Sequence, residues 1–332
     1  MENVIMYKFK YPSQIGIEIT NKCNFHCEHC INSSSEHDTL EMPLWKIKEI
    51  IDYMHERQLI CLDISGGEPL LHPDFHEIIE YGYSKGMAMS VASNGYILSP
   101  EVIALLLRCE VNLRISYDGY DEKSYALIRG NGKFETVRKN ILLAVESGIP
   151  TTLITVLHSK NINHLFKFIE NAKALNAVKL RFIPFAPSGR GSSSNLEMIS
   201  TNEWKNIIEN HKKWWNEYGI EIAIDSPLMA IAENIMCPCM VGKLYLVIKT
   251  NGNAIPCALL NIPLGNIYET DIDQIWNNEI FDELNDTSLL KEDCENCEYK
   301  ITCAGGCRGL SYLLKNDYLC KDPFCWIQSQ SK

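Results

Sequence analysis

Apolar and polar residues follow two alternating rhythms along the first two thirds of the chain. Short runs that are apolar throughout, or that alternate apolar and polar side chains, predict β-strands. Longer runs with apolar residues three and four positions apart predict helices. The predicted strands are residues 15–19, 60–64, 87–92, 111–117, 151–157 and 178–183. The predicted helices are residues 44–57, 75–85, 100–108, 136–147, 163–175 and 204–218.

Six strand–helix units in succession favour an α/β fold. Such alternation is typical of a parallel sheet with right-handed crossover connections. Six units suit a partial (β/α)6 barrel as well as an open doubly wound sheet, and periodicity alone does not separate the two. In both architectures the functional residues gather at the carboxyl ends of the strands. We therefore look for candidate chemistry in the segments that follow the predicted strands.

Composition narrows the class of protein. The chain has 332 residues, 46% of them apolar and 22% charged, as in a globular domain. No apolar run reaches the roughly 18 residues that span a bilayer. The first residues also lack a basic segment followed by an apolar one, so we expect a cytoplasmic protein with no membrane partner. The formal net charge of −11 argues against nucleic acid as a partner.

Fourteen cysteines are the unusual feature of the composition. In a long chain without an export signal, clustered thiols point to metal binding rather than to disulfides. Three cysteines lie within residues 23–30, two stand alone, and nine follow residue 230. The stretch 231–332 also holds 14 acidic and eight basic residues. We therefore expect two metal-binding domains, residues 1–230 and a smaller cysteine-rich α+β domain over residues 231–332.

The loop after the first predicted strand carries Cys23, Cys27 and Cys30, which can wrap around a single metal centre. A zinc site normally closes with four ligands, and a [4Fe–4S] cluster is usually held by four cysteines. Three thiolates therefore leave one position open. His26 or His29 is an alternative fourth ligand and would complete a zinc site. An iron–sulfur cluster with one iron free for an outside ligand fits the count of three better.

The second predicted strand ends in Gly66-Gly67-Glu68-Pro69, which alone would be an ordinary turn. Together with the cysteine spacing, this turn resembles the radical S-adenosylmethionine (SAM) superfamily. The resemblance implies a partial barrel, a [4Fe–4S] cluster on the three cysteines, and chelation of its open iron by the amino and carboxylate groups of SAM. Glycine lets backbone carbonyls approach a ligand closely, and those carbonyls and the Glu68 carboxylate can accept hydrogen bonds from an ammonium.

The same resemblance implies further contacts with SAM. Ser116 and Asp118 lie at the carboxyl end of the fourth predicted strand, where members of the family contact the SAM ribose. Arg129, beyond a short helix, corresponds to a residue that often pairs with the SAM carboxylate. His29 stands where many members have a Tyr or Phe beside the adenine. His158 matches none of these motifs and is predicted to be an ordinary surface or loop residue.

The C-terminal cysteines form an ordered pattern. Cys239 is followed by Gly252-x4-Cys257 and then by five more cysteines with spacings x2, x5, x3 and x17. These five are Cys294, Cys297, Cys303, Cys307 and Cys325. The pattern resembles the SPASM extension, which in relatives binds two auxiliary [4Fe–4S] clusters. A pair of zinc ribbons is the alternative, because paired cysteines at these spacings also suit zinc.

The crossed ligand pattern of that family implies which cysteines share a cluster. The outer auxiliary cluster takes Cys294, Cys297, Cys303 and Cys325. The inner one takes Cys239, Cys257 and Cys307, and a predicted β-hairpin over residues 243–256 would bring Cys239 and Cys257 together. The chain would then hold three [4Fe–4S] clusters, one that binds SAM and two auxiliary ones.

The fourth ligand of the inner cluster has two candidates. Pro238 biases Cys237 toward extended backbone, in which residues i and i+2 face the same side about 6.6 Å apart, so Cys237 and Cys239 can reach different irons of one cluster. Cys320 is the rival, either as a ligand or as a catalytic thiol that gives a hydrogen atom to a substrate radical. We favour Cys237 as the ligand.

The reaction implied by the resemblance is reductive. One electron enters the SAM sulfonium, SAM splits into methionine and a 5′-deoxyadenosyl radical, and this radical removes a hydrogen atom from the substrate. The cofactor supplies the chemistry and the protein supplies positioning. Relatives with both domains mature ribosomally made peptides by cross-linking, epimerisation or oxidation, and we expect the same here. The alternative is a dehydrogenase or epimerase of a small molecule such as an aminoglycoside or a tetrapyrrole.

The expected partners follow from this reaction. Few residues precede the first predicted strand, so a peptide substrate would need a separate leader-peptide-binding protein or direct recognition. The reduction needs an electron donor such as flavodoxin or ferredoxin. A two-domain iron–sulfur electron carrier is a further alternative, which would explain the cysteines but not the Gly-Gly-Glu turn. Failure of the reduced protein to consume SAM would favour that carrier.

Overall fold

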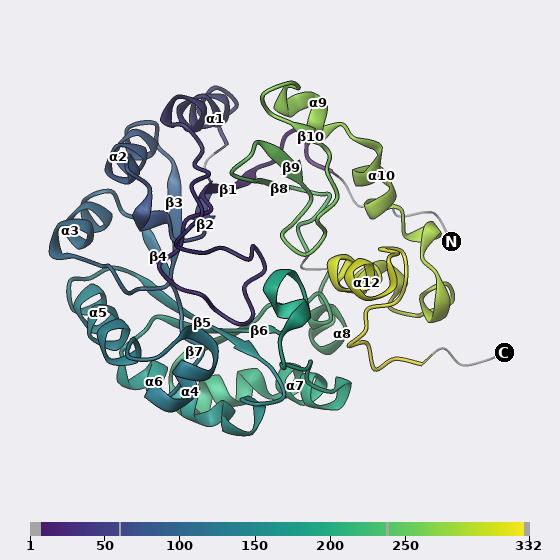
Figure 1. Ribbon diagram of the computed structural model, residues 1–332. Helices are drawn as coiled ribbons and strands as arrows, with labels where there is room; N and C mark the ends of the chain where they lie inside the picture. Colours follow the sequence, from purple (N-terminus) through teal and green to yellow (C-terminus); the bar gives the residue numbers. More distant parts are fainter. Residues whose placement is uncertain (1–7, 60, 237–238, 329–332) are drawn as a thin grey trace.

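One ten-stranded sheet organises the computed structural model, which describes residues 8–59, 61–236 and 239–328 (Figure 1). Strands β1 to β7 are parallel and lie side by side in chain order. Their bounds are β1 (Gln14–Thr20), β2 (Cys61–Gly66), β3 (Ala88–Ser93), β4 (Asn112–Ser116), β5 (Thr151–Leu157), β6 (Lys179–Pro184) and β7 (Glu221–Ile224). All their carboxyl ends therefore meet at one rim.

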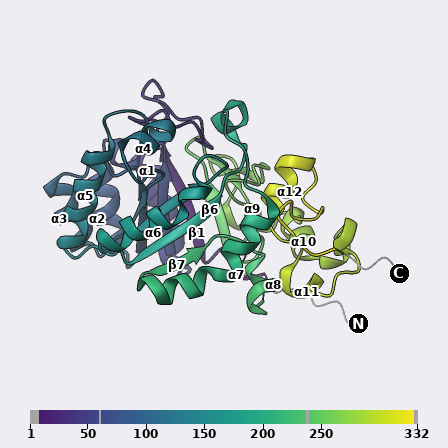
Figure 2. The same ribbon diagram turned by 90° about the horizontal axis from the view of Figure 1, so that it is seen from below.

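Helices connect the parallel strands and surround the outer face of the sheet (Figures 1 and 2). They are α1 (Leu44–Glu56), α2 (Phe75–Ser84), α3 (Pro100–Arg108), α4 (Glu122–Arg129), α5 (Phe134–Glu146), α6 (Leu165–Ala174) and α7 (Thr201–Tyr218). Their starts follow ordinary capping rules: Ser200 and Glu203 form a capping box at α7, and Ser99 caps α3 just before its first-turn proline. No helix within the described ranges is long and apolar enough to cross a membrane.

The predicted α/β fold is confirmed, and all six predicted strand–helix units are present within a few residues of their expected bounds. Among the α-helices and strands of residues 8–236, two short ones were missed, β7 and α8 (Met229–Glu233). Each has four or five residues, too few for a periodic pattern to show. The pairing of β7 with β6 extends the parallel sheet by one strand beyond the prediction.

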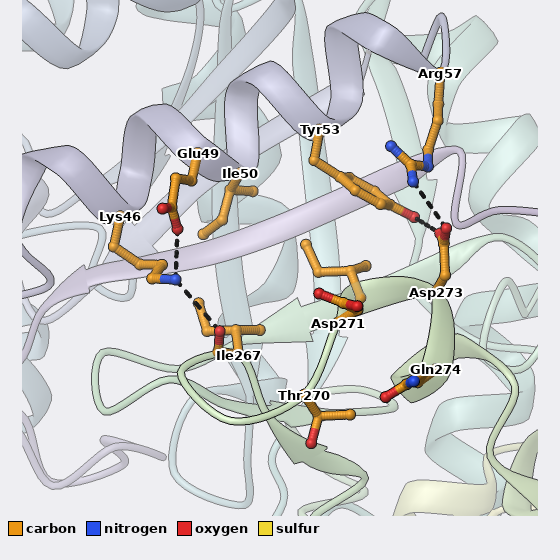
Figure 3. Close-up of a pocket in the computed structure, with 11 residues that line it drawn as sticks. Lys46, Glu49, Ile50, Tyr53, Arg57, Ile267, Thr270, Asp271, Asp273 and Gln274 are labelled. Carbon is orange, nitrogen blue, oxygen red and sulfur yellow. Dashed lines mark hydrogen bonds and ion pairs between the residues drawn. The ribbon is translucent and has the colours of Figure 1, made fainter.

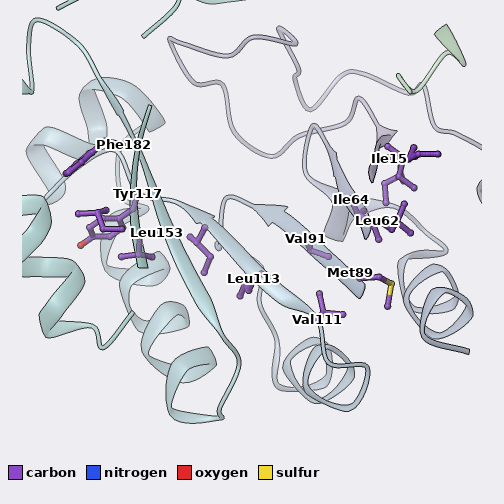
Figure 4. Close-up of a cluster of buried hydrophobic side chains, with 14 of the residues drawn as sticks. Ile15, Leu62, Ile64, Met89, Val91, Val111, Leu113, Tyr117, Leu153 and Phe182 are labelled. Atoms are coloured by element: carbon purple, nitrogen blue, oxygen red, sulfur yellow. The ribbon is translucent and has the colours of Figure 1, made fainter. Parts of the chain in front are cut away.

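The two faces of the parallel strands differ in burial. Residues that face the helices are buried and mostly apolar, as Leu62, Val91, Leu113 and Leu153 illustrate (Figure 4). Residues at the alternate positions of β2 to β6 face the inside of the curved sheet, and most of them are half-buried. We call this inner face the lumen. Since strand side chains alternate with period two, a continuous apolar layer outside and a partly accessible lumen inside follow from the same alternation.

The C-terminal part extends the same sheet from its other edge. The predicted hairpin is present as β8 (Tyr245–Ile248) and β9 (Asn253–Ile255), followed by β10 (Gly265–Asn266). β8 also pairs in parallel with β1, an arrangement that the sequence did not predict. The described sheet therefore runs β10-β9-β8-β1 through β7 without closing.

The remaining C-terminal elements are short helices that lie beside the barrel, on the side of the hairpin (Figures 1 and 2). They are α9 (Ile272–Trp276), α10 (Glu279–Asn285), α11 (Lys300–Cys303) and α12 (Arg308–Lys315). The proposed domain boundary at residues 230 and 231 falls inside α8, and it stays a prediction.

A polar cavity of about 540 Å³ lies between α1 and the segment from β10 to α9, on the outside of the barrel (Figure 3). Asp273 accepts hydrogen bonds there from the Tyr53 hydroxyl at 2.7 Å and from the Arg57 guanidinium at 2.8 Å. The Lys46 ammonium donates to the Ile267 carbonyl at 3.3 Å. These contacts join the barrel to the C-terminal part.

Candidate functional site

The first three cysteines lie on the loop that leaves the carboxyl end of β1. Cys23 and Cys27 are buried, and Cys30 is half-buried. Burial raises the pKa of the Cys23 thiol to about 12, and the charges of Cys27 and Cys30 act in the same direction. The structure therefore places the three predicted cysteines on one loop, with two of them buried.

Protein contacts hold this loop from several sides. The Arg190 guanidinium donates to the carbonyls of Cys27 at 2.7 Å, Ser34 at 2.9 Å and Ser33 at 3.3 Å. The Cys23 amide also donates to the Ser35 carbonyl at 2.9 Å. Arg190 lies in a segment rich in glycine and serine, where no sequence pattern marked it. The loop is thus shaped by the protein around it.

The donor set fits a cluster with an open position better than a closed zinc site. His26 is exposed to solvent while the neighbouring cysteines are covered. His29 turns its Nε2 to the Asp118 carboxylate at 3.2 Å. Neither imidazole therefore joins the three thiols. Within the described ranges, no three Cys, His, Asp or Glu side chains are grouped as ligands of a single metal ion.

The Gly66-Gly67-Glu68 turn lies directly against the start of the cysteine loop. The amides of Gly67 and Glu68 donate to the carbonyls of Thr20 at 2.6 Å and Lys22 at 2.8 Å. A Cβ on Gly67 would lie 2.3 Å from the Lys22 carbonyl oxygen, and Gly66 has a φ of +140°. Only glycine permits this close approach of two backbones. The turn and the cysteine loop therefore form one packed unit.

Glu68 has a structural role that the sequence did not reveal. Its carboxylate is buried and accepts hydrogen bonds from the Asn94 amide at 2.7 Å, the Ser93 hydroxyl at 2.9 Å and the Leu70 amide at 3.3 Å. Burial raises the pKa of Glu68 to about 7. These donors tie the end of β3 to the turn after β2. The expected contact between Glu68 and the SAM ammonium stays a prediction. The carbonyls of Gly66 and Gly67 belong to the same turn.

Asp118, Arg129 and His29 form one buried cluster beside Cys27. Arg129 forms an ion pair with Asp118, with its Nε 2.6 Å from Oδ2, and its NH1 lies 3.5 Å from the Cys27 sulfur. Burial alone would raise the pKa of Asp118, but the Arg129 guanidinium and His29 hold that pKa well below its usual range. Asp118 therefore stays ionised and positions the other two side chains.

Ser116 and His158 complete this side of the rim. Ser116 ends β4 on the lumen face, next to Ile154 of β5. His158 lies in the loop just after β5, which fits its prediction as a surface or loop residue, but its side chain is buried. Its Nδ1 accepts the Lys160 amide at 3.2 Å, and its Nε2 has no partner among the described residues. Burial lowers the pKa of His158 to about 4, so the ring is neutral. A lone histidine after a strand gave no signal of this placement.

The C-terminal cysteines fall into two groups, within which the charge of one thiol affects the pKa of another. Burial raises the pKa of Cys294 to about 11, and the charges of Cys325 and Cys297 add to this effect. Burial also raises the pKa of Cys307 well above its usual value, and Cys257 and Cys239 act in the same direction. The first group holds three cysteines assigned to the outer cluster, and the second holds the three assigned to the inner cluster; the ligand sets themselves stay a prediction.

Asp322 organises the segment between these two groups. Its carboxylate accepts hydrogen bonds from the Cys307 amide at 2.7 Å and from the Phe324 amide at 2.8 Å. A Cβ on Gly306 would lie 2.4 Å from the Asp322 Cβ, and Gly306 has a φ of +76°. Burial raises the pKa of Asp322 to about 6. The carboxylate thus fixes Cys307 on one side and the approach to Cys325 on the other.

The other three predicted cysteines differ in their burial and in whether the structure describes them. Cys237 lies outside the described residues. Cys303 is buried at the end of α11. Cys320 is half-buried, and its charged neighbours include Asp317, Glu292 and Lys315, all in the C-terminal part. The structure therefore does not bring Cys320 to the residues beside Cys27.

Two family models match the chain. The model of the radical SAM superfamily matches residues 17–172, which include the end of β1 and all of β2 to β5. The model of an iron–sulfur cluster-binding domain, SPASM, matches residues 237–298.

Curated relatives align along nearly the whole chain. An AdoMet-dependent heme synthase of Methanosarcina barkeri is 31% identical and covers 95% of this chain and 96% of its own length. The mycofactocin maturase MftC of Mycobacterium ulcerans is 26% identical and covers 95% of this chain and 88% of its own length.

Solved structures share the fold. Streptococcus suis SuiB bound to S-adenosylmethionine superimposes with a TM-score of 0.81 over 96% of this chain and 78% of its own, at 14% identity. SuiB bound to precursor peptide SuiA gives the same TM-score. At this identity the likeness concerns the arrangement of the chain.

Proposed function

Because this chain belongs to the radical SAM superfamily and carries a SPASM iron–sulfur cluster-binding domain, we propose that it matures a ribosomally made peptide by cross-linking, epimerisation or oxidation. Membership makes the chain an enzyme that binds iron–sulfur clusters and SAM. SAM on a reduced cluster supplies a radical that removes a hydrogen atom from the substrate. The protein contributes binding, orientation and exclusion of water.

The residues of the rim divide this work. Cys23, Cys27 and Cys30 hold the SAM-binding cluster, and the loop contacts of Arg190 keep them in position. The carbonyls of the Gly66-Gly67 turn receive the SAM ammonium. Further contacts with SAM come from Ser116, Asp118, Arg129 and His29.

The open sheet is the observation that carries the peptide proposal. Among the described strands, β7 and β10 are both unpaired on their outer edges, and the lumen side chains between them are partly accessible. An extended chain can therefore approach the rim from the side. The full-length alignment with a peptide maturase, MftC, supports the same proposal.

A tetrapyrrole is the second candidate substrate, because the AdoMet-dependent heme synthase has the higher identity and nearly the same length as this chain. One experiment separates the candidates. Anaerobically reconstituted protein is incubated with SAM and dithionite, either with short peptides encoded beside its gene or with iron coproporphyrin. A mass change in a peptide supports maturation. A change in the porphyrin alone, with every peptide unaltered, contradicts it.

Three [4Fe–4S] clusters are part of this proposal. The outer auxiliary cluster takes Cys294, Cys297, Cys303 and Cys325. The inner one takes Cys239, Cys257 and Cys307, with Cys237 as fourth ligand. Reconstituted protein should then hold about twelve iron atoms, four for each cluster. A value near four, with zinc making up the remainder, would overturn the auxiliary assignment.

The proposal extends to location and partners. We place the enzyme in the cytoplasm, where a reduced flavodoxin or ferredoxin can supply the electron. The role of Cys320 as a hydrogen donor and the separate leader-peptide-binding protein both stay predictions.

A further inference from the structure

Two arginines face the lumen from neighbouring parts of the sheet. Arg114 lies on β4 opposite Thr152 of β5, and Arg181 lies on β6 opposite Ile154 of β5. Adjacent strands are about 4.8 Å apart, so β4 and β6 are separated by about 10 Å. Both side chains are long enough to extend into the space between them. The function proposed above assigns neither residue a role.

Arg114 has few partners among the described residues. Its NH2 lies 3.3 Å from the Asp63 carboxylate, and its buried Nε has no partner among the described residues. A guanidinium has five N–H donors. Asp63, by contrast, also accepts hydrogen bonds from the Gln14 amide at 2.7 Å and from the Ser90 hydroxyl. Asp63 is therefore shared among three donors and orients Arg114 without satisfying it.

Arg181 is held even more loosely. Its NH1 lies 3.9 Å from Asp225, whose side chain is 57% exposed, while the Arg181 side chain is 33% exposed. An exposed ion pair at this distance is worth little, because water screens it. Arg181 can therefore exchange this contact for a better partner that enters the lumen.

Tyr245 connects the arginines to the C-terminal part. Its ring lies over Gly16, where a Cβ would be 2.6 Å from the Tyr245 hydroxyl. Burial raises the pKa of Tyr245, and the charges of Asp63, Arg114 and Cys257 also act on it. The hydroxyl is therefore a neutral donor near Arg114, on the side of an inner-cluster cysteine. No other described residue takes its proton in a hydrogen bond.

We propose that Arg114 and Arg181, together with the Tyr245 hydroxyl, bind a carboxylate of the substrate in the lumen. A carboxylate accepts two parallel hydrogen bonds from one guanidinium, and this satisfies the donors that the protein leaves unpaired. The inference rests on the proposed function in so far as the lumen holds the substrate. The carboxylate can belong to an acidic peptide residue or to a tetrapyrrole propionate.

Matched probes and variants test the proposal on anaerobically reconstituted full-length protein. The tetrapyrrole probes are coproporphyrin III and its tetramethyl ester. The peptide probes are two mixtures of short random peptides that differ only in a central glutamate or glutamine. The variants are Arg114→Met, Arg114→Lys and Arg181→Met, and Arg138→Met of α5 is a surface control. Iron content and the thermal unfolding midpoint show that each variant is folded and loaded.

Wild-type protein should bind the carboxylate form of one probe pair more tightly than its neutral form. That pair shows whether the bound carboxylate belongs to a peptide or to a tetrapyrrole. Arg114→Met should weaken this binding by about tenfold to a hundredfold. Arg114→Lys should recover part of it, because the charge remains without the two parallel donors. Arg181→Met should lower the affinity for the carboxylate probe by less than Arg114→Met does, and Arg138→Met should leave that affinity unchanged. Equal binding of carboxylate and neutral probes by the wild type would overturn the proposal.

Affinity for SAM gives a separate readout. It should be unchanged in Arg114→Met. A comparable loss of SAM affinity would overturn the proposal, because the carboxylate bound would then be that of SAM. If carboxylate preference is found but neither peptide nor porphyrin is modified by the wild type, the proposed function fails while this inference stands.

Discussion

The cysteine loop of the barrel, residues 22–35, and the C-terminal cysteine segment, residues 286–328, both bury thiols but are held in place by different means. The barrel loop is fixed by Arg190 on three carbonyls and by hydrogen bonds from Lys133 and Asn94 to Asn24. The C-terminal segment consists of helices of three to eight residues, joined by ion pairs at the surface and by the buried Asp322 carboxylate.

The difference indicates which region depends on metal. Surface ion pairs such as Lys291–Asp317 contribute about 0–1 kcal/mol each, and helices of a single turn are unstable alone. Cluster binding would therefore supply much of the folding free energy of the C-terminal segment. The barrel loop leaves a sheet of seven parallel strands and keeps its shape through protein contacts. We expect the two regions to respond differently whenever ligands are removed.

The largest effect is expected from replacing Cys23, Cys27 and Cys30 together by alanine. Formation of 5′-deoxyadenosine should be abolished, because no cluster remains to bind SAM. About eight of twelve iron atoms should stay on the auxiliary sites, since four belong to each cluster. Product analysis by chromatography and iron analysis check this. Deoxyadenosine formed at the normal rate would exclude this loop as the site of cleavage.

Replacing Cys294 and Cys297 by alanine should cause the next largest effect. Residues 286–328 should become sensitive to protease, because the outer cluster no longer organises the short helices, while the barrel keeps its unfolding midpoint. Limited proteolysis with mass analysis checks this. The matched variant Cys307→Ala should alter the paramagnetic resonance of the other auxiliary cluster. Perturbation of the same signal by both variants would contradict the crossed ligand pattern.

The sequence predicted the barrel well because its strands and helices are periodic over several residues. It also located the cysteine loop and the glycine turn, whose spacings are local. It did not reveal that Glu68 bonds to Ser93 and Asn94, that His158 is buried, or that Arg190 holds the loop. These contacts join residues 25 to 163 positions apart, or depend on burial that only the folded chain creates.

The parallel pairing of β8 with β1 escaped prediction for a similar reason. The hairpin of β8 and β9 has a local signal in Asn251-Gly252, and that part of the prediction is confirmed. Its attachment to β1 pairs Gln14 with Tyr245, and all seven parallel strands of the barrel lie between these residues in the sequence or contain one of them. No pattern within either strand specifies such a partner.

Arg190→Ala should have an intermediate effect on the barrel loop. Three hydrogen bonds from one guanidinium to carbonyls are lost, and bonds to a charged group contribute about 1.5–3 kcal/mol each when buried. Since Arg190 is half-buried, we expect the rate of deoxyadenosine formation to fall about tenfold, with the auxiliary iron unchanged. Arg138→Ala on α5 is the control. An unaltered rate would mean that the loop does not need this support.

Arg57→Ala should have the smallest effect. The Arg57–Asp273 pair joins α1 to α9, but its side chains are 26% and 38% exposed, so solvent weakens it. We expect a loss of about 1 kcal/mol or less, a shift of about 2 °C in the unfolding midpoint. Calorimetry checks this. A drop of many degrees would show that the two parts depend on this contact for stability.

Hydrogen exchange of the metal-free chain against the reconstituted chain tests the contrast between the two regions most directly. Without metal, the amides of β1 to β6 and of residues 22–35 should remain protected, whereas those of residues 286–328 should exchange rapidly. Reconstitution should restore protection in the C-terminal segment. Equal protection of both regions without metal, or equal loss in both, would contradict the account.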